Sequence, residues 1–254
     1  MSKKIVFADE KNVFVISKSK TSNKKISDGK PLVQTYTFSR DQYNLATTSK
    51  GFGMKKFFAL DGANCMDCKF SGNQGSGGCY THKFNQYVGF LSMLRSIKQN
   101  DLTAFDINKV STCDPYDTNY KPQHDGRFDE IMEMCKGSYV RFGTYGEPSL
   151  FPLELIQEMT DVASNWTGYT HQHDKEFAQG YKDFFMASTH TDEEANQRSE
   201  DGWRSFIALE LGSDANAISC PASKEAGFVT NCAKCSLCSG AKGKGKKNVK
   251  ILLH

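Results

Sequence analysis

The sequence predicts an α/β protein built as a partial (β/α) barrel behind an N-terminal extension. From residue 56 onward, short apolar runs alternate with segments whose apolar residues recur every three or four positions, as strands alternate with helices. About six such units would make a partial or closed barrel, with a doubly wound open sheet as the alternative. Chemically versatile residues also follow the ends of predicted strands, where such folds place their functional groups: Cys65, Glu147, His171, His190, Cys220 and His254.

Length and composition narrow the class of protein. The 254 residues suffice for one large α/β domain or two small ones, and 38% apolar with 24% charged residues excludes a disordered chain. No apolar run approaches the roughly 20 residues of a membrane span, and the first residues lack the apolar stretch of a secretory signal. We therefore expect a cytoplasmic protein. The net charge of +3 does not by itself indicate nucleic acid, and the Lys–Gly run 242–247 is interpreted as a solvated loop, with phosphate contact as the alternative.

The elements follow in order. Residues 1–55 are polar and rich in Lys and Ser, and we interpret them as an N-terminal extension with strands near 4–16 and 33–38. Residues 56–254 form the predicted barrel with its Cys-rich C-terminal segment. The apolar run 57–60 is interpreted as the strand before the first cysteine loop. The same patterns predict helices at 84–97, 127–135, 155–163 and 192–201, and strands at 139–143, 166–170, 184–188, 203–210, 217–219 and 249–253.

Nine cysteines are the strongest chemical signal, and seven of them lie in two short clusters. Because cytosolic thiols are kept reduced, metal binding is a better interpretation of this clustering than a disulfide framework. Cys113 and Cys135 stand apart and are expected to pack as small hydrophobic residues.

The C-terminal set is the more specific one. Cys232, Cys235 and Cys238 are spaced as in ferredoxin runs whose thiolates wrap a [4Fe–4S] cluster, and Cys220 would supply the fourth ligand. Structural zinc usually takes two separated Cys-x-x-Cys pairs, so one triple plus a distant single cysteine favours iron. Zinc and unligated thiols stay open as alternatives.

The N-terminal set has the spacing C-x2-C-x10-C-x2-H, formed by Cys65, Cys68, Cys79 and His82. Read locally, this is close to a zinc-finger ligand set, although His82 also fits the start of the following helix. Three interpretations compete: a separate zinc site, a second cluster or a share of the C-terminal one, and free or redox-active thiols. We expect both sets to lie on the same face of the predicted barrel, which allows shared ligation.

Two resemblances extend this interpretation. The stretch 140–148, which ends in Gly146-Glu147-Pro148 before an amphipathic helix, resembles the glycine–glutamate–proline stretch of radical SAM enzymes, and three cysteines follow the first predicted barrel strand. The resemblance implies that Glu147 meets the amino group of S-adenosylmethionine. That family generally carries C-x3-C-x2-C, whereas this chain has C-x2-C-x10-C.

The arrangement over 56–254, with its Cys-Pro-Ala-Ser…Cys-x-x-Cys-x-x-Cys ending, resembles uncharacterised bacteriophage proteins. This resemblance implies a phage-encoded iron–sulfur protein with a reduced radical-SAM-like barrel in the host cytoplasm.

Each of the remaining candidate ionisable residues has both a functional and an ordinary structural interpretation. Glu147 and Arg141 are candidate cofactor-binding residues, or simply an ion pair at a strand end. His171, His173 and His190 are candidate proton carriers, since histidine titrates near neutral pH, or ordinary polar surface.

Three functions follow from these observations. The first is an iron–sulfur protein whose [4Fe–4S] cluster serves structure, sensing or the binding of a host partner. The second is a radical-SAM-related enzyme. The third is a zinc-stabilised nucleic-acid-binding protein.

Overall fold

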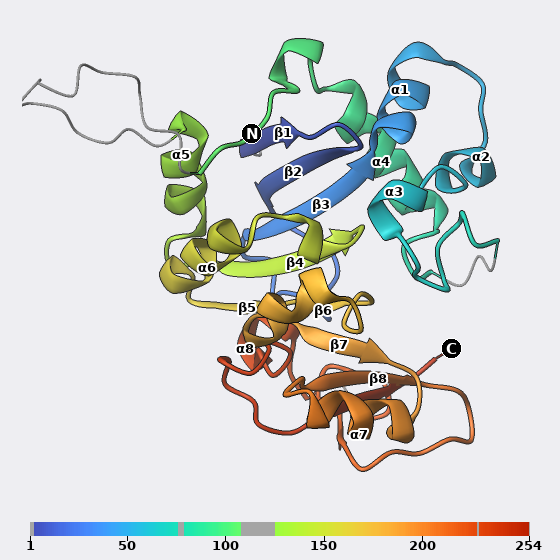
Figure 1. Cartoon of the computed structure of the whole chain (residues 1–254), viewed down its shortest axis with the longest axis vertical. Coiled ribbons are helices and arrows are strands. Elements are labelled where there is room, and N and C mark those ends of the chain that lie inside the picture. The colour runs from blue at the N-terminus through green and yellow to red at the C-terminus, as the bar shows by residue number, and fades with distance from the viewer. Residues whose placement is uncertain (1–2, 76–78, 108–124, 228, 254) are drawn as a thin grey trace, which may run out of the picture.

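The computed structural model describes residues 3–75, 79–107, 125–227 and 229–253. Its strands form two five-stranded sheets, in the orders β1-β2-β3-β4-β5 and β6-β7-β8-β10-β9 (Figure 1). The strands are β1 (Lys3–Ala8), β2 (Asn12–Ser19), β3 (Leu32–Ser39), β4 (Tyr139–Tyr145), β5 (Asn165–Thr167), β6 (Tyr169–Thr170), β7 (Met186–Thr189), β8 (Ser205–Leu209), β9 (Ile218–Ser219) and β10 (Val249–Leu252).

Most strand pairs are parallel. β1, β2 and β3 pair antiparallel, whereas β3, β4 and β5 pair parallel, and every pair in the second sheet is parallel. β5 and β6 are separated by Gly168 alone, so one short stretch of chain joins the sheets. A Cβ at Gly168 would lie 2.5 Å from the ring of Phe185, which explains the glycine at this crossing. The α/β class is confirmed. No closed barrel forms among the described strands, because β1 and β5 are the edges of the first sheet and β6 and β9 are the edges of the second.

Helices cover the sheets. They are α1 (Arg40–Thr48), α2 (Met54–Phe58), α3 (Gly62–Cys65), α4 (Phe84–Arg95), α5 (Gly126–Cys135), α6 (Leu153–Val162), α7 (Asp192–Glu200) and α8 (Cys232–Cys235), with 3-10 turns η1 (Gln99–Asp101), η2 (Pro148–Leu150) and η3 (Glu176–Asp183). α5 and α6 share an apolar core with β4, including Val140 and Phe142, and α1, α2 and α4 share a second core with β2 and β3. α7 packs on β7 and β8 (Figure 1).

The apolar run 57–60 is a correction. Residues up to Phe58 belong to helix α2, not to a strand, and Phe57 and Phe58 pack against Tyr87 at the core beside α4. A run of four apolar residues carries no decisive period, so packing decided its state. β3 instead is the first parallel strand before the cysteine loop. The helices predicted from 84, 127, 155 and 192 and the strands predicted from 139 to 253 are confirmed, with ends shifted by a few residues.

The first 55 residues contribute β1, β2 and β3 to the same sheet as β4. They also contain α1, whose N-terminus is closed by a capping box between Ser39 and Gln42. Cys135 is fully buried in the core beneath α5, as expected, and Cys113 lies outside the described residues. Among the described helices, none is both long and apolar enough to cross a membrane.

Candidate metal centres

The three-cysteine loop is tied to the ends of β3 and β4 through Asn64. The Asn64 side chain donates to the carbonyl oxygen of Thr37 at 2.9 Å, and its backbone carbonyl accepts from the N–H of Glu147 at 2.7 Å. Gly146 makes this approach feasible, because its φ is +74° and a Cβ there would lie 2.4 Å from the Thr37 oxygen. Cys65, at the end of α3, is thereby held at the C-terminal ends of the parallel strands β3 and β4, and not after a strand at 57–60 as the sequence predicted.

Asp61 closes the same loop from within. Its carboxylate is fully buried and accepts from the N–H groups of Gly72 and Asn73, both at 2.8 Å. Gly72 lies so close to α2 that a Cβ would stand 2.3 Å from the Phe58 oxygen. These bonds join the two ends of the chain segment that carries Cys68.

The thiols of Cys65, Cys68 and Cys79 lie close enough for their charges to interact. Burial raises the pKa of Cys65 well above its usual value and that of Cys68 to about 11, and burial also raises the pKa of Cys79. The free thiols are therefore protonated at neutral pH, and a metal would have to displace those protons. The ring of His82 stacks on Phe58 with centroids 4.0 Å apart, and its Nε2 is 3.5 Å from Asp61.

Glu147 follows β4 and is almost fully buried. Its carboxylate accepts from the N–H and hydroxyl of Ser149 at 3.1 and 2.8 Å, from the N–H of His171 at 3.1 Å, and from the Thr170 hydroxyl. Burial raises the pKa of Glu147, and these hydrogen bonds oppose the shift. A carboxylate has about four acceptor positions. This one therefore mainly links the ends of β4 and β6.

The C-terminal cysteine segment runs between β9 and β10 and folds back across the sheets. Its described part contains a single regular element, the four-residue α8 capped by Asn231. The N–H of Cys220 donates to Lys250 in β10, and the carbonyl of Cys238 accepts from Gly168, both with short bonds of 2.8 and 3.0 Å. At α8, the N–H of Cys232 donates to the Lys25 carbonyl at 2.9 Å.

Three of its four cysteines belong to or pack against one apolar cluster. Cys220 and Cys238 are buried beside Met186 and Val249, and Cys232 packs against the same cluster. The charge of Cys238 interacts with those of Cys220, Cys232 and Cys235. Burial raises the pKa values of Cys220, Cys232 and Cys238. All eight described cysteines are free thiols, so these four remain available as ligands.

The two sets occupy different ends of the strands. Cys232 packs with Leu32 and Tyr139, the first residues of β3 and β4, and the carbonyl of Ala233 accepts from Asn165, the first residue of β5. α8 therefore lies where these strands begin, whereas Cys65 lies where β3 and β4 end. The expectation that both sets share one face is wrong, because the chain after Cys220 turns back along the sheet.

Arg141, in the middle of β4, does not pair with Glu147. Its guanidinium donates to the hydroxyl of Tyr80 at 3.0 Å and lies over the Tyr80 ring, 5.9 Å from the centroid. Cys232 is close enough that the Arg141 charge opposes the rise that burial causes in the pKa of that thiol. Arg141 and Tyr80 thus lie between the two cysteine sets.

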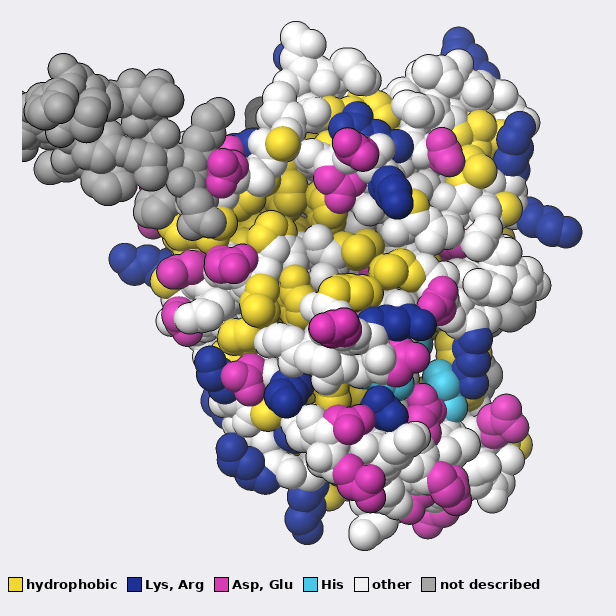
Figure 2. Space-filling model, viewed as in Figure 1, with side chains coloured by type: hydrophobic (Ala, Val, Ile, Leu, Met, Phe, Trp, Pro, Cys, Tyr) yellow, Lys and Arg dark blue, Asp and Glu magenta, His cyan; other side chains and the backbone are white. Residues whose placement is uncertain are grey.

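The histidines gather where β6 and β7 end. The rings of His171 and His190 stack 6.2 Å apart, with Phe70 of the cysteine loop edge-on to His190 at 5.0 Å. His173 is buried, with its Nε2 3.5 Å from Glu194. Burial lowers the pKa of all three, that of His171 to about 4, so they are neutral at neutral pH. Figure 2 shows histidine side chains reaching the surface among charged groups on this side.

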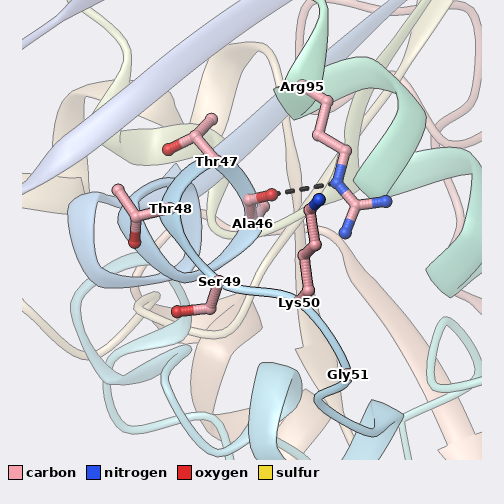
Figure 3. A pocket seen from close by; sticks show the side chains of 7 residues that line it. All are labelled: Ala46, Thr47, Thr48, Ser49, Lys50, Gly51 and Arg95. Atoms are coloured by element: carbon pink, nitrogen blue, oxygen red, sulfur yellow. Dashed lines mark hydrogen bonds between the residues drawn. The ribbon is translucent and has the colours of Figure 1, made fainter.

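Two further sequence features have structural roles. Lys242, in the Lys–Gly run, forms an ion pair with Asp183 at 3.5 Å. A shallow pocket between the end of α1 and α4 is lined by Lys50 and Arg95 (Figure 3), and there the Arg95 Nε donates to the Ala46 carbonyl at 2.9 Å. Arg95 thereby caps the carbonyl end of α1.

Within the described ranges, no three His, Cys, Asp or Glu side chains converge tightly enough to form a ready-made metal site. The donor chemistry nevertheless suits iron or zinc, because three and four free thiols are gathered at two places. The thiols therefore fit as ligands that a bound metal would draw closer together. The His82 side chain faces the Asp61 carboxylate.

Sequence reasoning missed Asp61, Asn64 and Tyr80. Asp61 before Gly62 could have been recognised as the polar residue ahead of a short helix. The other two act through contacts with β3 and β4, which no local pattern reveals. Comparisons with protein-family models, curated proteins and solved structures found no match to the chain.

Proposed function

We propose that the protein is an iron–sulfur protein whose C-terminal set, Cys220, Cys232, Cys235 and Cys238, holds a [4Fe–4S] cluster with a structural role. The observation that carries the proposal is that Cys220, Cys232 and Cys238 meet in one apolar cluster, with Cys235 close enough to Cys238 for charge interaction, on a segment with almost no regular structure. A cluster supplies strong bonds to several ligands at once, so metal binding would stabilise the fold of that segment.

The arrangement of the segment supports a structural role. The backbones of Cys220, Cys238 and Cys232 form hydrogen bonds with β10, Gly168 and Lys25, respectively. A cluster would connect these points through Cys220, Cys232 and Cys238. The cluster would then hold β9 and β10 against the beginnings of β3, β4 and β5. Sensing or the binding of a host partner would be further roles of the same cluster. The phage origin stays a prediction from the sequence.

Iron and sulfide analysis of anaerobically purified protein tests the proposal. We expect about four irons and four sulfides per chain from the C-terminal set, lost in the triple variant Cys232→Ala, Cys235→Ala, Cys238→Ala. Cys135→Ala, which removes a buried core thiol that belongs to neither set, should keep the wild-type content. Wild-type iron in the triple variant would overturn the proposal, and stoichiometric zinc in its place would favour the zinc-stabilised alternative.

A second candidate function is a radical-SAM-related enzyme. The favouring observation is that Cys65 lies at the ends of β3 and β4, and that Cys65 and Cys68 are close enough to Glu147 for charge interaction, with Cys79 interacting with both thiols. Three thiolates leave one iron of a cubane open, whereas four leave none. The engaged carboxylate of Glu147 and the C-x2-C-x10-C spacing weigh against S-adenosylmethionine binding.

Product analysis separates the two candidates. Reduced protein incubated with S-adenosylmethionine should yield no more 5′-deoxyadenosine than the Cys65→Ala variant. Several turnovers in the wild type, lost in Cys65→Ala while the C-terminal iron remains, would instead support the enzyme.

A further inference from the structure

Helix α4 presents an exposed flank that is apolar at its beginning and cationic at its end. Phe84 is 68% exposed and Val88 is 48% exposed, and the two lie four residues apart. Arg95 follows on the same flank, because steps of three and four residues keep side chains on one side of a helix. At 1.5 Å per residue, the flank measures about 16 Å from Phe84 to Arg95.

Two shallow hollows adjoin along this flank at Arg95. The first lies on α4, has a volume of about 560 Å³, and is lined in part by Val88, Leu91 and Arg95. The second, of about 630 Å³, lies between Arg95 and the chain that leaves α1 at Lys50. Figure 3 shows the Lys50 amine and the Arg95 guanidinium side by side at the second hollow. The flank therefore forms one side of a groove with two cations at its end.

The chain around this groove carries an excess of positive charge. Residues 40–101 contain eight Lys or Arg and four Asp or Glu, whereas residues 174–214 contain four Lys or Arg and ten Asp or Glu. Figure 2 shows acidic side chains gathered over α7, which belongs to the second range. The two parts of the molecule therefore present opposite charges to a partner.

The four carboxylates of residues 40–101 are placed away from the groove or are engaged elsewhere. Asp61 is buried inside its own loop, Asp67 pairs with Lys175, and Asp101 accepts from a backbone N–H group. Asp41 lies in the first turn of α1, at the opposite end of that helix from the groove.

The cations of the groove are therefore available to a ligand. Within the part of the chain that the structure describes, neither Lys50 nor Arg95 forms an ion pair. Arg95 donates only its Nε–H, to the Ala46 carbonyl at 2.9 Å, which leaves the four N–H groups on its two terminal nitrogens. Lys55 and Lys56, in the next helix, are exposed and also form no ion pair among the described residues.

An exposed ring and unpaired cations along one groove match a single-stranded nucleic acid. Lys and Arg bind its phosphates, and an unpaired base stacks on an aromatic side chain. At about 3.4 Å per stacked nucleotide, a groove of about 16 Å accommodates four or five nucleotides. The bases of a duplex are covered by their neighbours, and an acidic peptide offers no base to the ring, so both partners would leave Phe84 unused.

We propose that the exposed flank of α4, together with Lys50, binds single-stranded nucleic acid. A base stacks on Phe84 and packs against Val88, and phosphates farther along the strand bind Arg95 and Lys50. This interaction surface is an addition to the structural role of the metal centre.

Fluorescence anisotropy of a labelled single-stranded DNA of about 12 nucleotides, titrated with the full-length, metal-loaded protein, tests the surface. We expect saturable binding that weakens as salt is added, and a loss of about tenfold in Phe84→Ala, which removes the stacking ring. Phe84→Trp should keep the affinity, because it keeps a ring. Lys50→Gln and Arg95→Gln should each weaken binding and reduce its slope against the logarithm of salt concentration by about 0.7.

Two control variants match these changes. Phe177→Ala removes a ring that is 47% exposed in the acidic part of the chain, and Lys242→Gln removes a cation that already pairs with Asp183. Both should leave the affinity unchanged. Thermal unfolding of every variant checks that it is folded, and Phe84→Trp separates the loss of stacking from a loss of structure.

Several outcomes would overturn the proposal. One is the absence of saturable binding, and another is equal affinity in the wild type and Phe84→Ala. Equal affinity for the matched duplex or for polyglutamate would also overturn it, because the groove would then attract anions without stacking a base. Weakening by Lys242→Gln but not by Lys50→Gln would place the binding at the Lys–Gly run instead.

Discussion

The two cysteine regions are held in place by different forces. The loop with Cys65 is tied by its own polar side chains, since Asp61 binds two backbone N–H groups within it and Asn64 joins it to β3 and β4. The segment from Cys220 to Cys238 has one short helix, is joined to β10, Lys25 and Gly168 by backbone hydrogen bonds, and places three of its cysteines in an apolar cluster. Under the proposed function, the protein alone folds the first region, whereas a bound cluster would complete the fold of the second.

Metal removal is the strongest way to break this comparison. We expect anaerobic chelation to abolish hydrogen-exchange protection over residues 220–227 and 229–248, because metal binding free energy there is folding free energy. Protection of residues 61–73 should persist, since protein hydrogen bonds hold them. Exchange measured by mass spectrometry before and after chelation checks both. Equal loss in the two regions would mean that the loop also depends on metal.

The support of the first loop by β3 is tested at Gly146. Gly146→Ala adds a Cβ 2.4 Å from the Thr37 oxygen at a φ of +74°, and we expect a loss of about 3 kcal/mol in the free energy of unfolding. The matched control is Gly137→Ala, where φ is +64° but no atom lies within 4 Å, so strain alone should cost about 1 kcal/mol. Urea denaturation measures both, and equal losses would show that the close approach is unimportant.

The internal closure of the loop is tested at Asp61. Asp61→Asn keeps the shape but replaces one acceptor by a donor facing a buried N–H, which should cost about 2 kcal/mol. Asp67→Asn, at an exposed ion pair with Lys175, should change stability by less than about 0.5 kcal/mol. Iron bound by the C-terminal set should be unchanged in both variants. A loss of that iron in Asp61→Asn would contradict the independence of the two regions.

The smallest expected effect is a pH dependence beside the first loop. The pKa of His171 is lowered to about 4 by burial and by nearby positive charges, so the unfolded chain binds its proton more readily. The corresponding stability is fully present above about pH 6.5 and is lost as the pH falls toward 4. We expect His171→Gln to reduce the stability difference between pH 7 and pH 5 by about 1 kcal/mol, measured by urea denaturation. An unchanged difference would show that His171 is already solvated.

Several elements of the fold could be predicted from local pattern. The periodicity around Leu155, Ile156 and Met159 identified α6, and Gly137 marked the end of α5, because apolar faces and caps are local features. The prediction of a strand at Phe57–Leu60 is wrong, because a run of four apolar residues fits a strand or a helix equally well. In the sequence, the short strand β9 is marked only by the apolar pair Ala217-Ile218 between two polar residues.

The sequence by itself determined the alternation of strands and helices, the two cysteine sets and the position of Glu147 after β4, because periodicity, spacing and neighbouring glycines are properties of adjacent residues. Only the tertiary structure decided which thiols meet, that α8 lies at the strand beginnings and Cys65 at the strand ends, and that Arg141 contacts Tyr80 instead of Glu147. These outcomes depend on how far the chain after Cys220 turns back across the sheet. That turn is set by burial and by backbone hydrogen bonds between residues distant in sequence.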